Sequence, residues 1–329
     1  MECQCRISAF SNAHRGFYIA GDSNTGTTMS FPWISMPGRR RRPTALVLGG
    51  GGARGLAHIG LLEVLDAHQL RPDMVVGTSI GAIVGAMYAQ AGDSRDLRTR
   101  MTAFLHSDFF TSMELQAFYR KRDKELFPFI EEWMREIRMR LQMTRVLTKR
   151  GVIPREILTT GLGMLIDDRS IEEFPIPFAC VAMDALTGQV RILREGSAVQ
   201  AVAASSSIPG IIEAENSATG YLIDGAVTAG APVREAAALG ARTTVAVDVS
   251  ADLEWERLPE AAYEVMIRAG DIASAHCNRE QLSDADLVLR PSVGRLHWAQ
   301  FDDADSIIEA GRSEALAQLP RLRKHLAKT

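Results

Sequence analysis

The sequence predicts an α/β fold built around a mainly parallel β-sheet, and three observations carry this prediction. A short apolar strand at 44–48 runs into four consecutive glycines. Apolar residues at helical spacing then mark a helix from Leu56 to Leu65. A second apolar strand at 74–76 leads into another tight turn and a second helix at 80–90. Strand and helix alternate as a βαβα unit, which places successive strands side by side and parallel.

One domain follows an N-terminal extension. The chain has 329 residues and is 46% hydrophobic, which is enough material for one large core. Residues 1–43 are instead polar, and they end in four arginines and a proline. No apolar segment near Met1 resembles a signal peptide. We expect a flexible extension over 1–43 and a single folded domain over 44–329.

Charge and cysteine usage exclude some functions. The formal net charge is −3, so the chain lacks the overall basic character of a nucleic-acid-binding protein. No apolar run approaches the length of a membrane span. The four cysteines form no Cys-x-x-Cys pair, which suits a reducing compartment. We expect a cytoplasmic protein without a metal or a nucleic-acid partner.

Further elements follow along the chain. Segment 95–155 holds 14 Lys and Arg against 8 Asp and Glu, with large apolar side chains at helical spacing. It predicts a basic helical region that either packs on the core or lies lid-like over the site against a membrane surface. Strands are expected at 176–183, 190–193, 220–226, 243–249 and 287–289, and helices at 198–204, 232–239, 272–280 and 303–326.

The glycine loop after the first strand has the composition of an anion site. Glycines at a helix N-terminus leave backbone N–H groups unshielded. The loop matches the dinucleotide fingerprint, but the second strand ends in Gly77-Thr78-Ser79 without the acid that would hold a ribose. A phosphate loop would need Lys where Leu56 stands. The remaining option is an oxyanion hole. Its candidate residues are Gly50, Gly51, Gly52, Ala53, Arg54 and Gly55.

The turn after the second strand has the pattern G-x-S-x-G. A strand, a sharp turn and a helix form a nucleophile elbow when a serine occupies the tip, as Ser79 does here. The flanking glycines allow the strand and the helix to approach closely. By itself the pattern is equally compatible with an ordinary turn. The elbow residues are Gly77, Thr78, Ser79, Ile80 and Gly81.

A serine hydroxyl needs a base to become a nucleophile, and two architectures compete for that role. A Ser-Asp-His triad would require His276 or His297, neither of which lies in a recognisable motif. A Ser–Asp dyad would require an aspartate held at a strand end. Asp224, followed by Gly225 and Ala226, meets that requirement.

Taken together, the three motifs resemble the signatures of the patatin-like phospholipases. They are G-G-G-x-R-G at 50–55, G-x-S-x-G at 77–81 and D-G-A at 224–226. The resemblance implies a three-layer α/β/α sandwich and lipid acyl hydrolase activity without a cofactor. It assigns Ser79 as nucleophile, Asp224 as base and the glycine loop as oxyanion hole, and it implies a phospholipid or other acyl-ester lipid as substrate.

Two alternatives remain open. The fold could serve a non-hydrolytic nucleotide-binding or regulatory protein, or the serine could belong to a Ser-Asp-His α/β-hydrolase. Reaction of Ser79 with a fluorophosphonate separates the first alternative from an enzyme. Substitution of His276 and His297 separates the second from the dyad.

Overall fold

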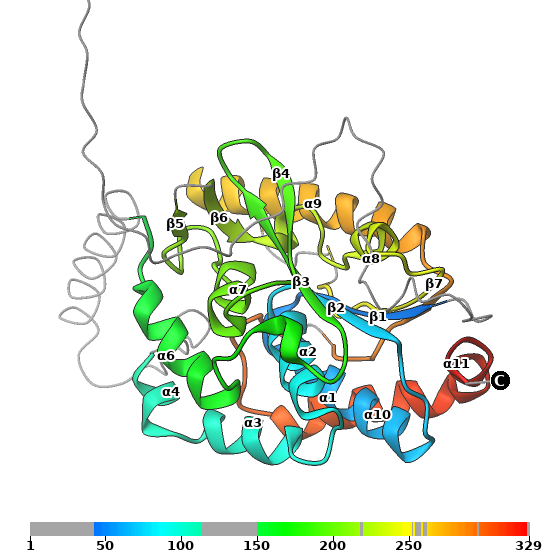
Figure 1. Ribbon diagram of the computed structural model, residues 1–329. Coiled ribbons are helices and arrows are strands. Elements are labelled where there is room, and N and C mark those ends of the chain that lie inside the picture. Colours follow the sequence, from blue (N-terminus) through cyan, green and yellow to red (C-terminus); the bar gives the residue numbers. More distant parts are fainter. Residues whose placement is uncertain are drawn as a thin grey trace, which may run out of the picture.

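A computed structural model describes residues 43–113, 150–217, 220–251, 253, 258, 262–294 and 296–327. Helices cover both faces of a central sheet, so the chain forms a three-layer α/β/α sandwich as predicted (Figure 1). The expected extension over 1–43, apart from Pro43, lies outside the described residues. The same holds for 114–149, the larger part of the expected basic helical region.

The sheet has eight strands in the order β5-β6-β3-β2-β1-β7-β8, with β4 paired to β3. The strands are β1 (Thr44–Leu48), β2 (Met74–Gly77), β3 (Phe178–Asp184), β4 (Gln189–Leu193), β5 (Glu215–Ser217), β6 (Gly220–Asp224), β7 (Thr243–Val247) and β8 (Leu287–Leu289). The pairs of β1 with β2 and β7, β2 with β3, and β7 with β8 are parallel. The pairs that involve β4, β5 and β6 are antiparallel, so the sheet is mixed at one side.

Helices α1 and α2 alternate with β1 and β2, as the sequence predicts for the start of the domain. The α-helices are α1 (Ala57–Ala67), α2 (Ile80–Ala91), α3 (Leu97–Leu105), α4 (Asp108–Ser112), α6 (Arg155–Leu165), α7 (Ala198–Ser205), α8 (Val233–Ala238), α9 (Ala262–Ser283), α10 (Ala304–Ala317) and α11 (Leu319–Leu326). Short 3₁₀ helices are η1 (Gly52–Leu56), η3 (Ile171–Glu173) and η4 (Gly225–Val227). None of the described helices is long and apolar enough to cross a membrane.

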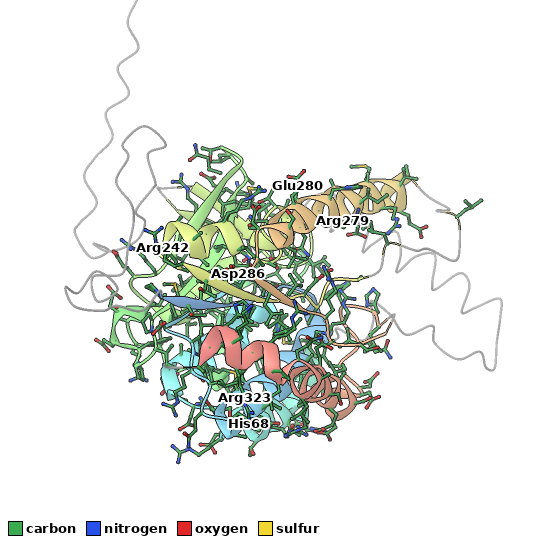
Figure 2. All side chains as sticks on the ribbon, turned by 90° about the vertical axis from the view of Figure 1, so that its right-hand side faces the viewer. His68, Arg242, Arg279, Glu280, Asp286 and Arg323 are labelled. Atoms are coloured by element: carbon green, nitrogen blue, oxygen red, sulfur yellow. The ribbon has the colours of Figure 1, made fainter. Side chains whose placement is uncertain are left out.

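Two apolar cores lie on opposite faces of the sheet. Alternate residues of a strand point to opposite faces, and β1 shows this directly. Leu46 and Leu48 belong to the larger core, with α1, α2 and α10. Ala45 and Val47 belong to a smaller core under α8 and the C-terminal part of α9. Figure 2 places Arg279 and Glu280 of α9 on one side of the strands and Arg323 of α11 on the other.

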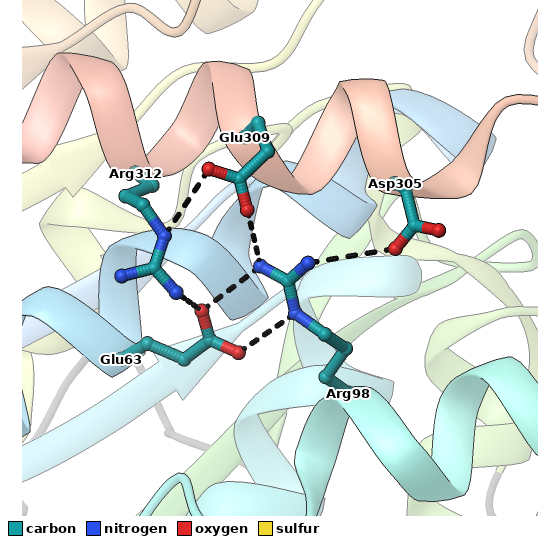
Figure 3. A network of polar contacts seen from close by, with 5 residues as sticks. All are labelled: Glu63, Arg98, Asp305, Glu309 and Arg312. Atoms are coloured by element: carbon teal, nitrogen blue, oxygen red, sulfur yellow. Dashed lines mark hydrogen bonds and ion pairs between the residues drawn. The ribbon is translucent and has the colours of Figure 1, made fainter.

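Helices α1 and α10 cross at two glycines. A Cβ on Gly60 would lie 1.9 Å from the carbonyl oxygen of Ile308, and one on Gly311 would lie 1.8 Å from that of Ala57. The backbones therefore meet without intervening side chains. An ion-pair network borders this crossing (Figure 3). It consists of Glu63, Arg98, Asp305, Glu309 and Arg312.

The C-terminal segment differs from its prediction. We expect one helix over 303–326, but the structure has α10 and α11, separated at Gln318. Pro320 lies in the first turn of α11. Proline has no N–H with which to continue a helix, so it is favoured in a first turn and disfavoured in a helix interior. The leucine periodicity continues across the break, and for that reason it predicts a single helix.

Candidate active site

The pairing along β3 brings the ends of β2 and β6 together. Cys180 pairs with both Gly77 of β2 and Leu193 of β4, while Ala182 pairs with both Asp224 of β6 and Arg191 of β4. Strand β4 therefore occupies one edge of β3, and β2 and β6 share the other. Since β2 runs parallel and β6 antiparallel to β3, their C-terminal ends face each other. Ser79 follows one of these ends and Asp224 closes the other.

Ser79 has a strained backbone. Its φ is 55° and its ψ is −124°, a conformation that residues with a side chain rarely adopt. The residues around it leave no room for side chains. A Cβ on Gly77 would lie 2.4 Å from the carbonyl oxygen of Gly81, and one on Gly81 would lie 2.1 Å from that of Leu48. The strand, the turn and α2 are thus packed backbone against backbone.

Asp224 lies next to Ser79. Hydrogen bonding to the Ser79 side chain and to the Ala226 N–H, the latter at 2.8 Å, lowers the pKa of the Asp224 carboxylate. Ser79 and Asp224 are 8% and 4% exposed as whole residues. Burial outweighs these hydrogen bonds and raises the pKa of Asp224 to about 6. A carboxylate with a raised pKa is a stronger base than an exposed one, which suits it to accept a proton near neutral pH.

The glycine loop adjoins this pair. A Cβ on Gly50 would lie 3.2 Å from the Cβ of Ala226 and 3.3 Å from that of Ser79, so all three motifs meet within van der Waals distance. Some loop N–H groups are already bonded: that of Gly50 donates to the Gly230 carbonyl and that of Ala53 to the Trp298 carbonyl. Within the part of the chain that the structure describes, the N–H groups of Gly51 and Gly52 have no acceptor. These two N–H groups are the loop donors that could bind a negatively charged oxygen.

Two basic side chains hold the loop in place. The buried Arg54 donates to the carbonyls of Val249, at 3.0 Å, and Leu296, at 2.6 Å. It therefore fixes the glycine loop against the segments that contain Val249 and Leu296. His58 is fully buried with Nε2 2.8 Å from the Gly49 carbonyl, and burial lowers its pKa to about 4. The neutral ring thus donates its Nε2–H to the base of the loop.

The two candidate triad histidines differ in their surroundings. His276 is an exposed residue of α9. His297 is partly buried beside Trp298, and its Nδ1 accepts from the Ala299 N–H at 3.3 Å. Burial lowers the pKa of His297.

Sequence reasoning misses one element of the site. Ser205, at the end of α7, accepts a hydrogen bond from the backbone N–H of Ser79 at 3.1 Å and donates to the Val181 carbonyl at 2.6 Å. The run Ser205-Ser206-Ser207 is visible in the sequence, but its spacing gives no indication of this contact. As for metals, the described residues hold no group of three or more His, Cys, Asp or Glu suited to bind one.

Comparison with known proteins gives a consistent result. The family model described as patatin-like phospholipase matches residues 46–237. A mouse protein, patatin-like phospholipase domain-containing protein 6, is 26% identical over 296 residues, which cover 81% of this chain and 20% of the relative. An uncharacterized NTE family protein of Mycobacterium tuberculosis is 28% identical over 306 residues, which cover 84% of this chain and 46% of the relative. The chain thus spans less than half of these relatives.

Two solved structures align with most of this chain. VipD from Legionella pneumophila aligns with a TM-score of 0.42 at 14% identity, over 86% of this chain and 67% of that one. The ExoU chain of the ExoU-SpcU complex from Pseudomonas aeruginosa aligns with a TM-score of 0.39 at 16% identity, over 86% of this chain and 52% of that one.

Proposed function

Because this chain belongs to the patatin-like phospholipase family, we propose that it is a serine acyl hydrolase that releases fatty acids from glycerolipid esters. The observation that carries the proposal is the placement of the Ser79 side chain beside the buried Asp224 carboxylate, close enough for hydrogen bonding that lowers the pKa of Asp224. The loop of 50–55 adjoins the same pair, so the proposed nucleophile, base and oxyanion donors lie next to one another.

In the proposed reaction Ser79 Oγ attacks the ester carbonyl while Asp224 accepts the hydroxyl proton. The carbonyl oxygen becomes an oxyanion, which accepts hydrogen bonds from the N–H groups of Gly51 and Gly52. Collapse of this intermediate breaks the ester bond, and Asp224 returns the proton to the departing alcohol. An acyl group remains on Ser79. Each oxyanion donor of this type typically contributes about 10²–10³-fold in rate.

The second half of the reaction regenerates the enzyme. A water molecule attacks the acyl carbonyl, and Asp224 accepts its proton. The second oxyanion collapses, releases the fatty acid and returns the proton from Asp224 to Ser79 Oγ. Asp224 therefore serves as base and then as acid in each half, which a carboxyl group with a pKa of about 6 performs near neutral pH.

A fluorophosphonate probe tests the proposal. It labels an activated serine and forms a stable adduct, so we expect labelling of the wild-type protein at Ser79 and none of Ser79→Ala. His276→Ala and His297→Ala serve as controls that keep both labelling and turnover. A protein that binds nucleotides without hydrolysis would leave Ser79 unlabelled. If a histidine variant were inactive while Asp224→Asn remained active, the result would favour the Ser-Asp-His triad.

The substrate class needs its own experiment. A hydrolysis panel of phospholipids, lysophospholipids and short acyl esters shows which headgroup and chain length the site prefers. The basic segment 95–155 suggests contact with anionic membrane surfaces. Charge reversal of Arg135, Arg138 and Arg140, which lie outside the described residues, would then weaken binding to anionic vesicles, and unchanged binding would refute this contact.

A further inference from the structure

The serine run 205–207 contacts the backbone of both proposed catalytic residues. The Ser205 hydroxyl accepts the Ser79 N–H at 3.1 Å, and the Ser207 carbonyl accepts the Asp224 N–H at 2.9 Å. Three consecutive residues at the end of α7 thus bridge the turn that carries the serine and the strand that carries the aspartate. This contact fixes the distance between the two backbones.

The Ser205 hydroxyl is enclosed on both sides. It is fully buried, and its own hydrogen is donated to the Val181 carbonyl at 2.6 Å. Val181 lies in β3 between the residues that pair with β2 and those that pair with β6. The same carbonyl borders Gly225, where a Cβ would lie 2.5 Å away. The hydroxyl therefore connects the turn to the one strand against which both catalytic segments are aligned.

The strained conformation of Ser79 makes this connection important. A residue in such a sparsely populated backbone region is unfavourable by itself and persists only where its surroundings hold it there. The preceding residue is already fixed, because the Thr78 N–H donates to the Leu48 carbonyl and its hydroxyl to that of Ala229. Ser205 adds the hydrogen bond to Ser79 itself. Without it, a buried N–H would lack an acceptor at the point where the backbone is most strained.

We propose that Ser205 is a positioning residue that holds the Ser79 backbone so that its hydroxyl faces Asp224. In a triad a third side chain orients the base relative to the nucleophile. In the proposed dyad, Ser205 and the Ser207 carbonyl perform that task through the backbone. This inference rests on the proposed function and adds a residue that makes no contact with the substrate.

The chain supplies a matched control two residues away. Ser207 is also fully buried, but its hydroxyl donates to the Ala203 carbonyl at 2.8 Å within the same helix end. Its link to Asp224 uses the backbone carbonyl and survives a change of side chain. Ser205→Ala and Ser207→Ala therefore each remove one buried hydroxyl, and only the first removes a contact with Ser79.

The experiment measures the second-order rate of fluorophosphonate labelling, kcat and KM for a short acyl ester, and thermal unfolding of the full chain. We expect Ser205→Ala to lower the labelling rate and kcat by about 10–100-fold, since a small misplacement of reacting atoms has effects of this size. KM should stay within about twofold, because Ser205 is not part of substrate binding. Ser207→Ala should label at the wild-type rate, although both variants lose comparable thermal stability.

Three results would contradict the inference or its premise. A wild-type labelling rate in folded Ser205→Ala overturns the positioning role alone, as does an equal loss of rate in both alanine variants. If Ser205→Ala does not fold, Ser205→Cys keeps the volume with a weaker acceptor, and a wild-type rate in that variant overturns the role as well. No labelling of the wild-type protein at Ser79 overturns the proposed function and this inference together.

Discussion

The edge of the sheet at Ser79 and the crossing of α1 with α10 are both built on glycines that touch backbone oxygens. Gly81 lies against Leu48 at the first, and Gly60 lies against Ile308 at the second. They differ in where they hold polar groups. The sheet edge buries a strained serine and a carboxylate, whereas at the helix crossing the charges lie around the rim (Figure 3).

The difference indicates that close packing serves two separate purposes in this molecule. At the helix crossing it brings two helix backbones together, and no group there is placed in the proposed catalytic site. At the sheet edge it forces Ser79 and Asp224 into a conformation and a charge state that are each unfavourable. Substitutions at the two regions should therefore move stability and activity in different directions.

Asp224→Asn has the largest expected effect: it should lower activity and raise stability. Loss of the base should lower kcat by about 10²–10⁴-fold. The pKa of Asp224 is raised from 3.8 to about 6, so burial of its charge destabilises the fold increasingly from pH 4 to 6 and fully above that range. Asparagine removes this penalty. The free energy of unfolding at pH 8 should rise by up to about 3 kcal/mol, with no gain at pH 4.

Urea unfolding at both pH values, beside an ester hydrolysis assay, checks this prediction. Ser79→Ala is the matched control: it should lose activity without a pH-dependent gain in stability. An Asp224→Asn variant that is less stable than wild type at pH 8 would show that the buried carboxylate stabilises the fold, and the proposed contrast between the regions would fail.

Gly60→Ala tests the other region. Its Cβ would meet the Ile308 backbone at 1.9 Å, so α1 and α10 must separate. Overpacking of this kind typically costs about 1–3 kcal/mol, and we expect the upper end because the neighbour is backbone. The labelling rate per folded molecule should not change. Gly163→Ala on α6, where no atom lies within 4 Å, is the control and should be neutral or slightly stabilising.

The pH profile tests the raised pKa of Asp224. Only the carboxylate accepts the Ser79 proton, so kcat/KM should be constant above about pH 7 and fall about tenfold per pH unit below 6. Initial rates on a soluble ester between about pH 4.5 and 8 measure this. A profile that remains flat to pH 4.5 would indicate an ordinary exposed carboxylate as base.

The ion-pair network should give the smallest effect. Arg98 contacts Glu63 at 3.0 and 3.1 Å through two nitrogens, and it also contacts Asp305 and Glu309. Partly exposed pairs are screened by water, so Arg98→Gln should lower the free energy of unfolding by about 1 kcal/mol or less, and less in high salt. Activity should be unchanged. Arg95→Gln, at an 85% exposed side chain paired with Asp93, is the control with an effect near zero.

The sequence predicts much of this fold because the relevant signals are local. The apolar run of β1, the glycines that follow and the helical spacing of α2 depend only on neighbouring residues. Asp224 at the end of a strand is also predicted. That β6 runs antiparallel along β3, and so meets β2, depends on pairing between distant segments, which one sequence does not reveal.

The supporting contacts of the site are harder to predict for the same reason. Trp298 accepts the Ala53 N–H from 245 positions later in the chain, and Ser205 contacts Ser79 across 126 positions. Neither serine runs nor single carbonyl groups have a pattern that marks such a role. In the described part of 95–155, the helices α3 and α4 agree with the helical character that the composition predicts.

Because the C-terminal ends of β2 and β6 face each other, this site should tolerate some kinds of mutation better than others. Along β3, only Val181 lies between the residue that pairs with the end of β2 and the residue that pairs with the end of β6. The strand register therefore sets the separation of Ser79 and Asp224. One residue inserted into β6 would turn Asp224 to the opposite face of the sheet. Substitutions along β3 that keep its length leave that separation intact. Insertions and deletions, rather than side-chain replacements, are therefore the changes to which this geometry is most vulnerable.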